Sequence, residues 1–223
     1  MASHKKKTFE AAQSGRVDVR LKRSAHKKIA PLLHGGLQRM ICLDETATYT
    51  HMTRTHGYSP IGVPVVERHK CKSARYTVLA AITKDEVLTH QTFPNSLNTA
   101  RWTAFVRDHL VPHLRFGDLV CMDNLRIHYN KQAIEAIRET GADVYFFPPY
   151  SPTSNPIEES FSQFKSMLRA LAPKSAETLR SAVDAAFAAI TPENLKAYFK
   201  HAFDVVQTWE DFDIFDALAV AAA

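Results

Sequence analysis

Two aspartates in this sequence stand where carboxylates could meet at one site. Asp44 ends the run MICLD and Asp123 ends the run LVCMD, so each follows four apolar residues. Such a run is typical of a buried strand. If the two strands are central, parallel neighbours, both carboxylates emerge at the same edge of the sheet, where open α/β sheets bind ligands. Taken singly, either aspartate could also be only a turn residue that caps the strand end.

Carboxylates that lie side by side repel each other, and a divalent cation is the simplest group that stabilises them. Oxygen ligands with few His or Cys residues nearby indicate Mg²⁺ or Mn²⁺. A third carboxylate would complete a two-metal site for phosphoryl transfer, in which the ions activate an attacking oxygen and stabilise the leaving one. The pattern therefore predicts two ions if a third acid joins the pair.

Glu158 is the candidate for the third carboxylate. It lies in the stretch SNPIEES, where Asn155 suits a helix cap and Pro156 the first helical position, so the stretch can also be no more than a helix start. Both interpretations can hold, because Glu158 lies beside the apolar stripe of the predicted helix, toward the sheet edge. Glu159 is turned about 100° further round the helix and is the weaker candidate. The stripe consists of Ile157, Phe161, Phe164, Leu168 and Leu171.

Other polar residues near these acids have two interpretations each. Asn124 directly follows the second aspartate and either supports the metal ligands or makes a turn. His128 either contacts a phosphate group or the edge of the site, or caps the next helix. Arg54 and Arg126 lie in loops near the expected edge and contact phosphates or remain solvated charges. Glu45 is expected to be structural or to support the ligands.

The elements that must position these residues follow from apolar periodicity. Core strands are predicted at 39–45, 74–83, 86–93, 117–124 and 143–149, with an outer strand and its turn at 46–62. Helices are predicted at 95–114, 130–141, 156–171, 175–190 and 192–206. The early strands are close enough in sequence to be antiparallel, whereas the later ones need helical crossovers and are expected to be parallel. A mixed sheet flanked by helices is the expected outcome.

Composition indicates an ordinary globular chain, and its charge fits an anionic partner, although many basic proteins bind none. The 223 residues are 45% apolar, enough for one sizeable core. The net charge is +5 and the pI is near 9.1, which fits nucleic acid. Residues 1–29 hold nine Lys or Arg against two acids, and the last fifteen residues hold four acids and no base. The basic segment suits a phosphate backbone, or is a solvated terminus.

The spacing of the cysteines and the lengths of the apolar runs indicate the cellular compartment of the protein. The three cysteines, Cys42, Cys71 and Cys121, are odd in number and have no CxxC spacing, so we expect reduced thiols in a cytosolic protein. The start MASHKKK lacks the apolar stretch of a secretion signal, and no run approaches 18 apolar residues. We therefore expect no membrane partner.

Three blocks of the sequence together resemble the DDE transposases of the mariner superfamily, in particular their bacterial insertion-sequence branch. The blocks are LDET with MTRTHGYSPIG around Asp44, VCMDNLRIH around Asp123 and FFPPYSPTSNPIEESFSQFK around Glu158. The last two acids are separated by 34 residues. The resemblance covers roughly residues 38–170, and the blocks agree with the family in order and spacing.

The resemblance implies a ribonuclease-H-like fold with a mixed five-stranded sheet, and Mg²⁺- or Mn²⁺-dependent cleavage and strand transfer of DNA. In such families water attacks a phosphodiester at the transposon end, and the freed 3′-hydroxyl then attacks target DNA, typically at TA. It implies that Asp44, Asp123 and Glu158 are the metal ligands. It also implies a homodimer assembled on DNA in a bacterial cytoplasm, associated with the nucleoid.

The corresponding division of the chain is a basic arm or linker at 1–37, a catalytic domain at 38–206 and an acidic tail at 207–223. Only about 38 residues precede the first catalytic strand, too few for the helix-turn-helix modules of such transposases. We therefore expect either a separate helix-turn-helix polypeptide or a truncated copy.

The sequence departs from the family pattern at two places. Thr153-Ser154 replaces the usual Asp-Leu before NPIE, and Ala47 replaces an aromatic residue that often follows DET. Two alternatives to a transposase stay open. One is a ribonuclease-H-like nuclease without strand transfer, and the other is a non-catalytic remnant that binds DNA or oligomerises.

Overall fold

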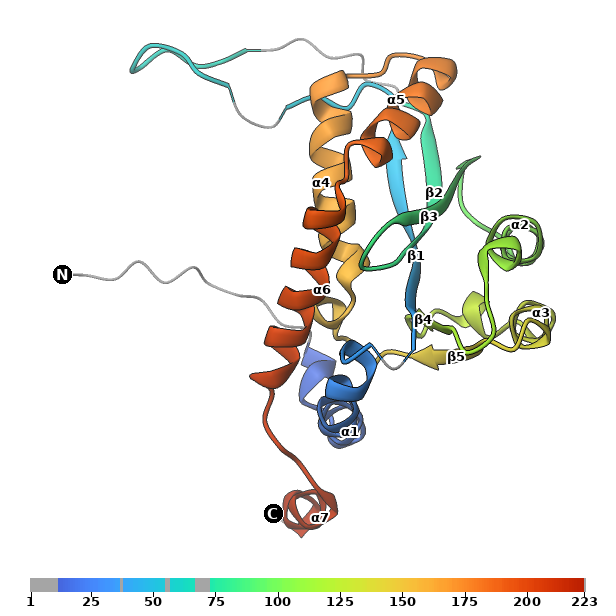
Figure 1. Cartoon of the computed structure of the whole chain (residues 1–223). Coiled ribbons are helices and arrows are strands. Elements are labelled where there is room, and N and C mark those ends of the chain that lie inside the picture. Colours follow the sequence, from blue (N-terminus) through green and yellow to red (C-terminus); the bar gives the residue numbers. More distant parts are fainter. Residues whose placement is uncertain (1–11, 37, 55–56, 67–72, 223) are drawn as a thin grey trace.

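The computed structural model describes residues 12–36, 38–54, 57–66 and 73–222. Its centre is a five-stranded sheet in the order β3-β2-β1-β4-β5 (Figure 1). The strands are β1 (Met40–Tyr49), β2 (Arg75–Ile82), β3 (Val87–Pro94), β4 (Leu119–Met122) and β5 (Asp143–Phe146). The β1–β2 and β2–β3 pairs are antiparallel, and the β1–β4 and β4–β5 pairs are parallel. The predicted mixed five-stranded sheet is thereby confirmed.

Helices cover both faces of this sheet. The α-helices are α1 (Val17–His34), α2 (Thr99–Phe105), α3 (Lys131–Glu139), α4 (Pro156–Leu171), α5 (Ala176–Ala188), α6 (Pro192–Gln207) and α7 (Ile214–Ala222). Short helical turns occupy Ala12–Gly15, Val106–Leu110, Val111–His113, Arg126–Tyr129 and Pro152–Ser154. Figure 1 shows α4, α5 and α6 on one side of the sheet and α2 and α3 on the other.

The helix ends follow from local residue chemistry. The side chains of Asn155 and Thr191 cap α4 and α6. Each accepts a hydrogen bond from a backbone N–H of the first helical turn, which has no partner within the helix. Gly141 adopts φ 81° just after α3, a left-handed conformation that glycine tolerates. Leu171 was predicted on the inner stripe of α4 but is 51% exposed. The reason is that α4 ends there, at Ala172, which has φ 46°.

Alternation along the strands builds one core on each face. In β1, Met40 and Cys42 join the cluster under α4, α5 and α6, while Ile41 and Leu43 join the cluster under α2 and α3. The residues of β4 divide between the two clusters in the same way. Successive side chains of a strand point to opposite faces, so Asp44, two residues after Cys42, belongs to the face that carries α4.

The predicted outer strand after Asp44 is wrong for the described residues. β1 does not stop at the acid but runs on to Tyr49, and Asp44 stands opposite Ala80 of β2. The parallel partner β4 ends earlier, at Met122. β1 continues past the end of β4 because β2, its neighbour on the side opposite β4, still supplies backbone hydrogen-bonding partners up to Tyr49.

Both segments that flank the predicted catalytic domain contain helices. In α1, which lies in the predicted basic arm, Val19 and Ala30 are buried while Lys22 and Lys28 are exposed. The predicted acidic tail contains α7, which contacts α1. The division of the chain into domains stays a prediction.

Two of the three cysteines lie in the described part of the chain. Cys42 and Cys121 are free and buried in strands, and Cys71 lies outside the described residues. Among the described residues, no helix combines the length and the apolar character that crossing a membrane requires.

Candidate active site

A cleft of about 460 Å³ brings the three predicted carboxylates together. Asp44 comes from the middle of β1, Asp123 is the first residue after β4, and Glu158 lies in the first turn of α4. All three line this cleft. The strand register explains the first two positions, because Cys42 pairs with Cys121 and the two aspartates follow at equal distance along the chain.

The start of α4 directs Glu158 to the cleft. Asn155 caps the helix, accepting a hydrogen bond from the Ile157 N–H, and Pro156 occupies the first turn. Glu158 is exposed in the cleft. Glu159 points elsewhere, because its carboxylate contacts His201 of α6.

Asp44 is a buried carboxylate with two hydrogen bonds. Its Oδ1 accepts from the Glu45 backbone N–H at 2.7 Å, and its Oδ2 accepts from the Asn155 side-chain amide at 3.1 Å. Only 6% of the residue is exposed. Burial raises the pKa of Asp44 well above its ordinary value, and the nearby charges of Asp123 and Glu45 raise it further. This carboxylate needs a cation or a proton.

Asp123 is held by a buried imidazole. Its Oδ1 lies 2.6 Å from Nδ1 of His128, while Nε2 of His128 lies 3.0 Å from Glu45 Oε2. The His128 side chain is 0% exposed, and its ring centroid lies 4.3 Å from that of Trp102. Burial alone would lower the pKa of His128, but the bonds to the two carboxylates raise it to about 10. His128 is therefore an imidazolium that donates to both.

The contact with His128 also lowers the pKa of Asp123. Burial would raise the pKa of this carboxyl group, but the hydrogen bonds from His128 and from the Leu125 N–H outweigh burial and lower it. Glu158 behaves in the opposite way. Its side chain is open to the cleft, but the walls of the cleft partly desolvate its carboxyl group, and this desolvation and the charge of Asp123 raise its pKa against the opposing effect of Lys165. The cleft thus combines one carboxyl group of lowered pKa, Asp123, with two of raised pKa, Asp44 and Glu158.

The remaining predicted residues occupy different positions. Asn124 lines the cleft, but its amide donates to the Phe147 carbonyl and accepts from the Tyr129 hydroxyl at 2.7 Å, which holds the loop. Arg126 is exposed and lines the cleft. Arg54 is exposed and is not among the described residues that line it.

Sequence reasoning missed two groups of contacts. Glu45 and His128 stand 83 residues apart, and no local pattern links them. Arg23 of α1 donates to Ser151 Oγ at 2.8 Å and to the Tyr150 carbonyl at 2.5 Å, and both partners line the cleft. The only sequence signal for Arg23 was the basic character of its segment. α1 therefore supports one wall of the cleft.

The carboxylates that line the cleft are ligands that suit a divalent cation, although they are not arranged to share one ion. Within the described part of the chain, no group of three or more His, Cys, Asp or Glu is arranged to hold a metal ion. Oδ1 of Asp123 accepts from the Leu125 N–H and also lies against Nδ1 of His128. Asp44, Asp123 and Glu158 still offer hard oxygen ligands in one cleft, and the buried Asp44 accepts hydrogen bonds from two neutral amides.

Comparisons with known proteins identify the family and the fold. A family model described as DDE superfamily endonuclease matches residues 39–180. None of the curated proteins matches the chain. The Mos1 transposase paired-end complex with left transposon end has a TM-score of 0.72 and 16% identity, covering 94% of this chain and 69% of that chain. The catalytic domain of Mos1 mariner transposase has a TM-score of 0.56 and 15% identity, covering 83% of this chain and 92% of that chain.

A mariner Mos1 paired-end complex with Mg is similar to the chain as well. Its TM-score is 0.69 at 16% identity, and the match covers 96% of this chain and 69% of that chain. At such identities the likeness shows the fold, which is the ribonuclease-H-like fold of these structures.

Proposed function

The chain belongs to the DDE superfamily endonucleases, and we propose that it is the catalytic domain of a mariner-like transposase of the bacterial insertion-sequence branch. In this proposal it hydrolyses a phosphodiester at the transposon end and joins the freed 3′-hydroxyl to target DNA by transesterification. The observation that carries the proposal is that Asp44, Asp123 and Glu158, from three separate elements, line a single cleft.

These three carboxylates are the proposed ligands of two Mg²⁺ or Mn²⁺ ions. When bound, such ions activate the attacking oxygen and stabilise the leaving oxygen. The burial of Asp44 among other acids supports the choice, since a buried anion needs a partner of opposite charge. Mos1 paired-end complexes solved with Mg and with Mn support the identity of the ions.

Other side chains position these ligands and the DNA. Asn155 and the Glu45 N–H orient the Asp44 carboxylate, and His128 orients that of Asp123. Arg126, exposed at the cleft, provides a guanidinium that pairs with a phosphate group of the entering strand. The site thus combines acids for the ions with a cation for the DNA backbone.

The proposed partners follow from the same function. They are transposon ends and TA-containing target DNA, a second copy of the chain when both are assembled on DNA, and a separate helix-turn-helix polypeptide that recognises the ends. The Mos1 complexes contain transposon ends, which supports DNA as the partner. The proposed compartment is the bacterial cytoplasm, at the nucleoid.

Asp123→Asn tests the metal-ligand assignment. We expect purified chain with Mn²⁺ or Mg²⁺ to nick supercoiled plasmid DNA, and the variant to lose at least about 100-fold in rate, because an amide is a poor ligand for these ions. Asp143→Asn is the matched control, since Asp143 is exposed at the start of β5 and outside the cleft. Nicking that survives in Asp123→Asn would sink the assignment.

A second assay separates a transposase from its alternatives. Pre-cleaved, labelled transposon ends are supplied with a target plasmid, and joined products are expected for a transposase. A nuclease without strand transfer would cut the plasmid but join nothing. A non-catalytic remnant would bind DNA equally with and without the ion in a metal titration.

A further inference from the structure

The segment between β5 and α4 directs two of the three carboxylates. Asn155, at the end of this segment, donates to Oδ2 of Asp44 at 3.1 Å, and Glu158 follows three residues later, in the first turn of α4. The stretch PPYSP at 148–152 contains three prolines, which have no backbone N–H to donate. The shape of the segment therefore depends on contacts with side chains.

Arg23 of α1 supplies such contacts at the middle of the segment. Its guanidinium donates to the Tyr150 carbonyl at 2.5 Å and to Ser151 Oγ at 2.8 Å. Tyr150 has φ 54°, and a bulky residue keeps this left-handed conformation only where its surroundings hold it. The Ser151 carbonyl accepts from Ser154 Oγ at 2.7 Å, one residue before the cap of α4. The turn that begins α4 is thus tied to Arg23.

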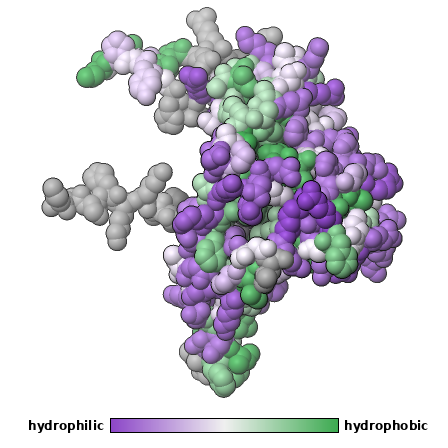
Figure 2. Space-filling view, in the orientation of Figure 1, coloured by the Kyte–Doolittle hydropathy of each residue, from purple (hydrophilic) through white to green (hydrophobic). Residues whose placement is uncertain are grey.

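The chain after α6 contacts Arg23 as well. Residues 209–212, which we call the strap, lie against α1. The ring centre of Trp209 is 5.4 Å from Cζ of Arg23, and the Phe212 N–H donates to Ser24 Oγ at 3.1 Å. The strap leads into α7, which contacts α1. Figure 1 shows α1 between the sheet and α7, and Figure 2 shows hydrophobic residues at that end of the molecule.

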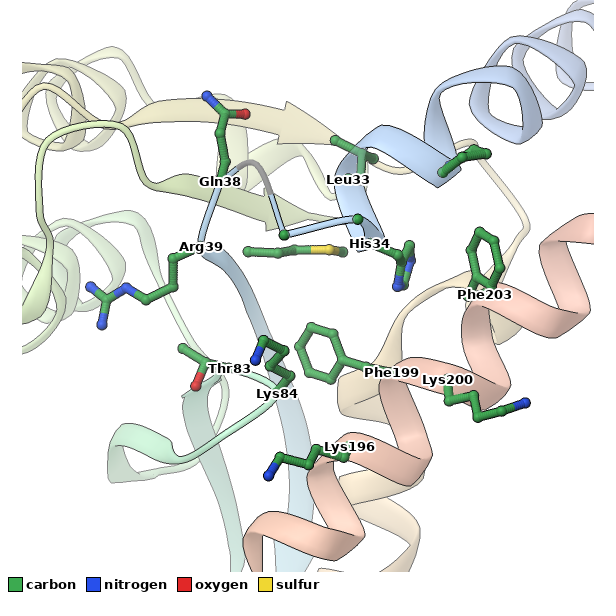
Figure 3. Close-up of a pocket in the computed structure, with 14 residues that line it drawn as sticks. Leu33, His34, Gln38, Arg39, Thr83, Lys84, Lys196, Phe199, Lys200 and Phe203 are labelled. Atoms are coloured by element: carbon green, nitrogen blue, oxygen red, sulfur yellow. The ribbon is translucent and has the colours of Figure 1, made fainter.

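Two further contacts fix α1 to the body of the protein. Nδ1 of His26 lies 2.7 Å from the hydroxyl of Tyr145 in β5. At the end of α1, the ring centre of His34 lies 5.1 Å from that of Phe203 in α6. Both residues line an apolar pocket of about 430 Å³ between α1, the start of β1 and α6, which Phe199 lines as well (Figure 3). The helix therefore holds Arg23 in place relative to the sheet.

We propose that Arg23, backed by Trp209, is a positioning residue for the carboxylates of Asp44 and Glu158. Its two hydrogen bonds fix residues 150–155, and this segment in turn orients the two acids. Arg23 thus has a role other than the DNA contact expected of the basic segment. The role rests on the proposed function, since it concerns the ions that these acids bind. Groups that orient metal ligands typically change metal affinity by about 10–100-fold.

The affinity of Arg23→Gln for Mn²⁺ tests this role, because two effects of the substitution have opposite signs. Loss of a positive charge near the cleft favours a cation, so a purely electrostatic role predicts tighter binding. Loss of positioning predicts that the Kd rises about tenfold. Electron paramagnetic resonance of free Mn²⁺, with the full chain and without DNA, measures the Kd.

Two variants control for charge. Arg16→Gln removes the same charge just before α1, where Arg16 is exposed and pairs with Asp18 at 2.9 Å, and it should leave the Kd unchanged. Arg23→Lys keeps the charge but lacks the planar fork that reaches both partners, so it should restore only part of the affinity. Full affinity in Arg23→Lys, or an unchanged or lower Kd in Arg23→Gln, overturns the positioning role alone. A wild-type chain that binds no Mn²⁺ overturns the proposed metal site together with it.

Hydrogen exchange of the metal-free chain follows the turn itself. The N–H groups of Ser154 and Asn155, each bonded within the turn at 3.0 Å, should exchange at least about tenfold faster in Arg23→Gln. The Ile134 N–H of α3 should exchange as in the wild type, which separates a local change from global unfolding. Unchanged exchange in the turn overturns the proposal.

A double variant tests whether Trp209 acts through Arg23. Trp209→Leu should raise both the Kd for Mn²⁺ and the exchange rates of the turn. Combined with Arg23→Gln, it should add nothing to the effect of Arg23→Gln alone, because two residues that act through one contact are not additive. Fully additive effects would overturn the role of Trp209 in holding Arg23.

Discussion

Asp44 and Asp123 occupy one cleft but are held in opposite ways. Burial and the charges of Asp123 and Glu45 raise the pKa of Asp44, and the hydrogen bonds that it accepts from two neutral amides do not offset them. Asp123 contacts the His128 imidazolium, which compensates its charge and lowers its pKa. His128 in turn is held by Glu45 on the face of the sheet opposite α4. His128 is therefore a positioning residue, whose effect on the chemistry passes through Asp123.

Removing this imidazole should destabilise the fold. His128→Ala leaves Asp123 and Glu45 without their shared partner and leaves a hole beside Trp102. We expect the free energy of unfolding in urea to fall by about 2–4 kcal/mol, less than for a fully buried pair because the Asp123 side chain is 41% exposed. His113→Ala, at an exposed position, should cost under about 0.5 kcal/mol. Equal losses in the two variants would contradict the role of His128.

Among the elements, α1 connects the basic start of the chain with the cleft. Arg23 holds the wall at Tyr150 and Ser151, and Lys22 lines a hollow of about 370 Å³ next to the cleft. Asn124 and Pro148 line both the hollow and the cleft, so the two openings adjoin. A strand of DNA in the cleft would pass close to Lys22.

Lys22→Gln should therefore weaken DNA binding. One phosphate contact fewer lowers the magnitude of the slope of log K against log salt concentration by about 0.9. Lys28→Gln is the matched control, because it removes the same charge from the same helix about 120° away around the axis. Fluorescence anisotropy with a labelled duplex at several salt concentrations measures both. A greater effect of Lys28→Gln would place the DNA on another side of α1.

In the whole molecule, the two ends of the β1–β4 pair serve different surfaces. The carboxylate cleft lies where β4 ends, and the apolar pocket lies where β1 begins. The two cores between them pack α4, α5 and α6 on one face and α2 and α3 on the other. Because this packing holds the three acids in one place, a cation bound to them is linked to folding of the entire chain.

Thermal unfolding should report that linkage. A cation that binds only the folded chain at about 100 times its Kd adds about 2.7 kcal/mol, so Mn²⁺ or Mg²⁺ should raise Tm in a concentration-dependent way. Glu158→Gln should reduce this rise, while Glu159→Gln should leave it unchanged, because Glu159 pairs with His201 outside the cleft. An equal rise in all three proteins would rule out Glu158 as a ligand.

Local patterns in the sequence were sufficient to predict the mixed sheet and to predict that three acids lie together at its edge. The runs MICLD and LVCMD are short apolar strands, and their repetition predicted that Asp44 and Asp123 lie together. Asn155 and Pro156 start α4 through bonds within one turn, which is why the position of Glu158 could be predicted as well. Patterns of this kind depend on neighbours along the chain, so they can be recognised without the fold.

Only the tertiary structure decided which groups control those acids. The contact of His128 with Glu45 joins residues 83 positions apart, and the continuation of β1 past Asp44 depends on its pairing with β2. The support of the cleft by Arg23 and the pocket at Phe199 likewise arise where distant segments pack together. The physical reason is that burial and hydrogen bonding across the sheet are set by register and packing, which no local run of residues encodes.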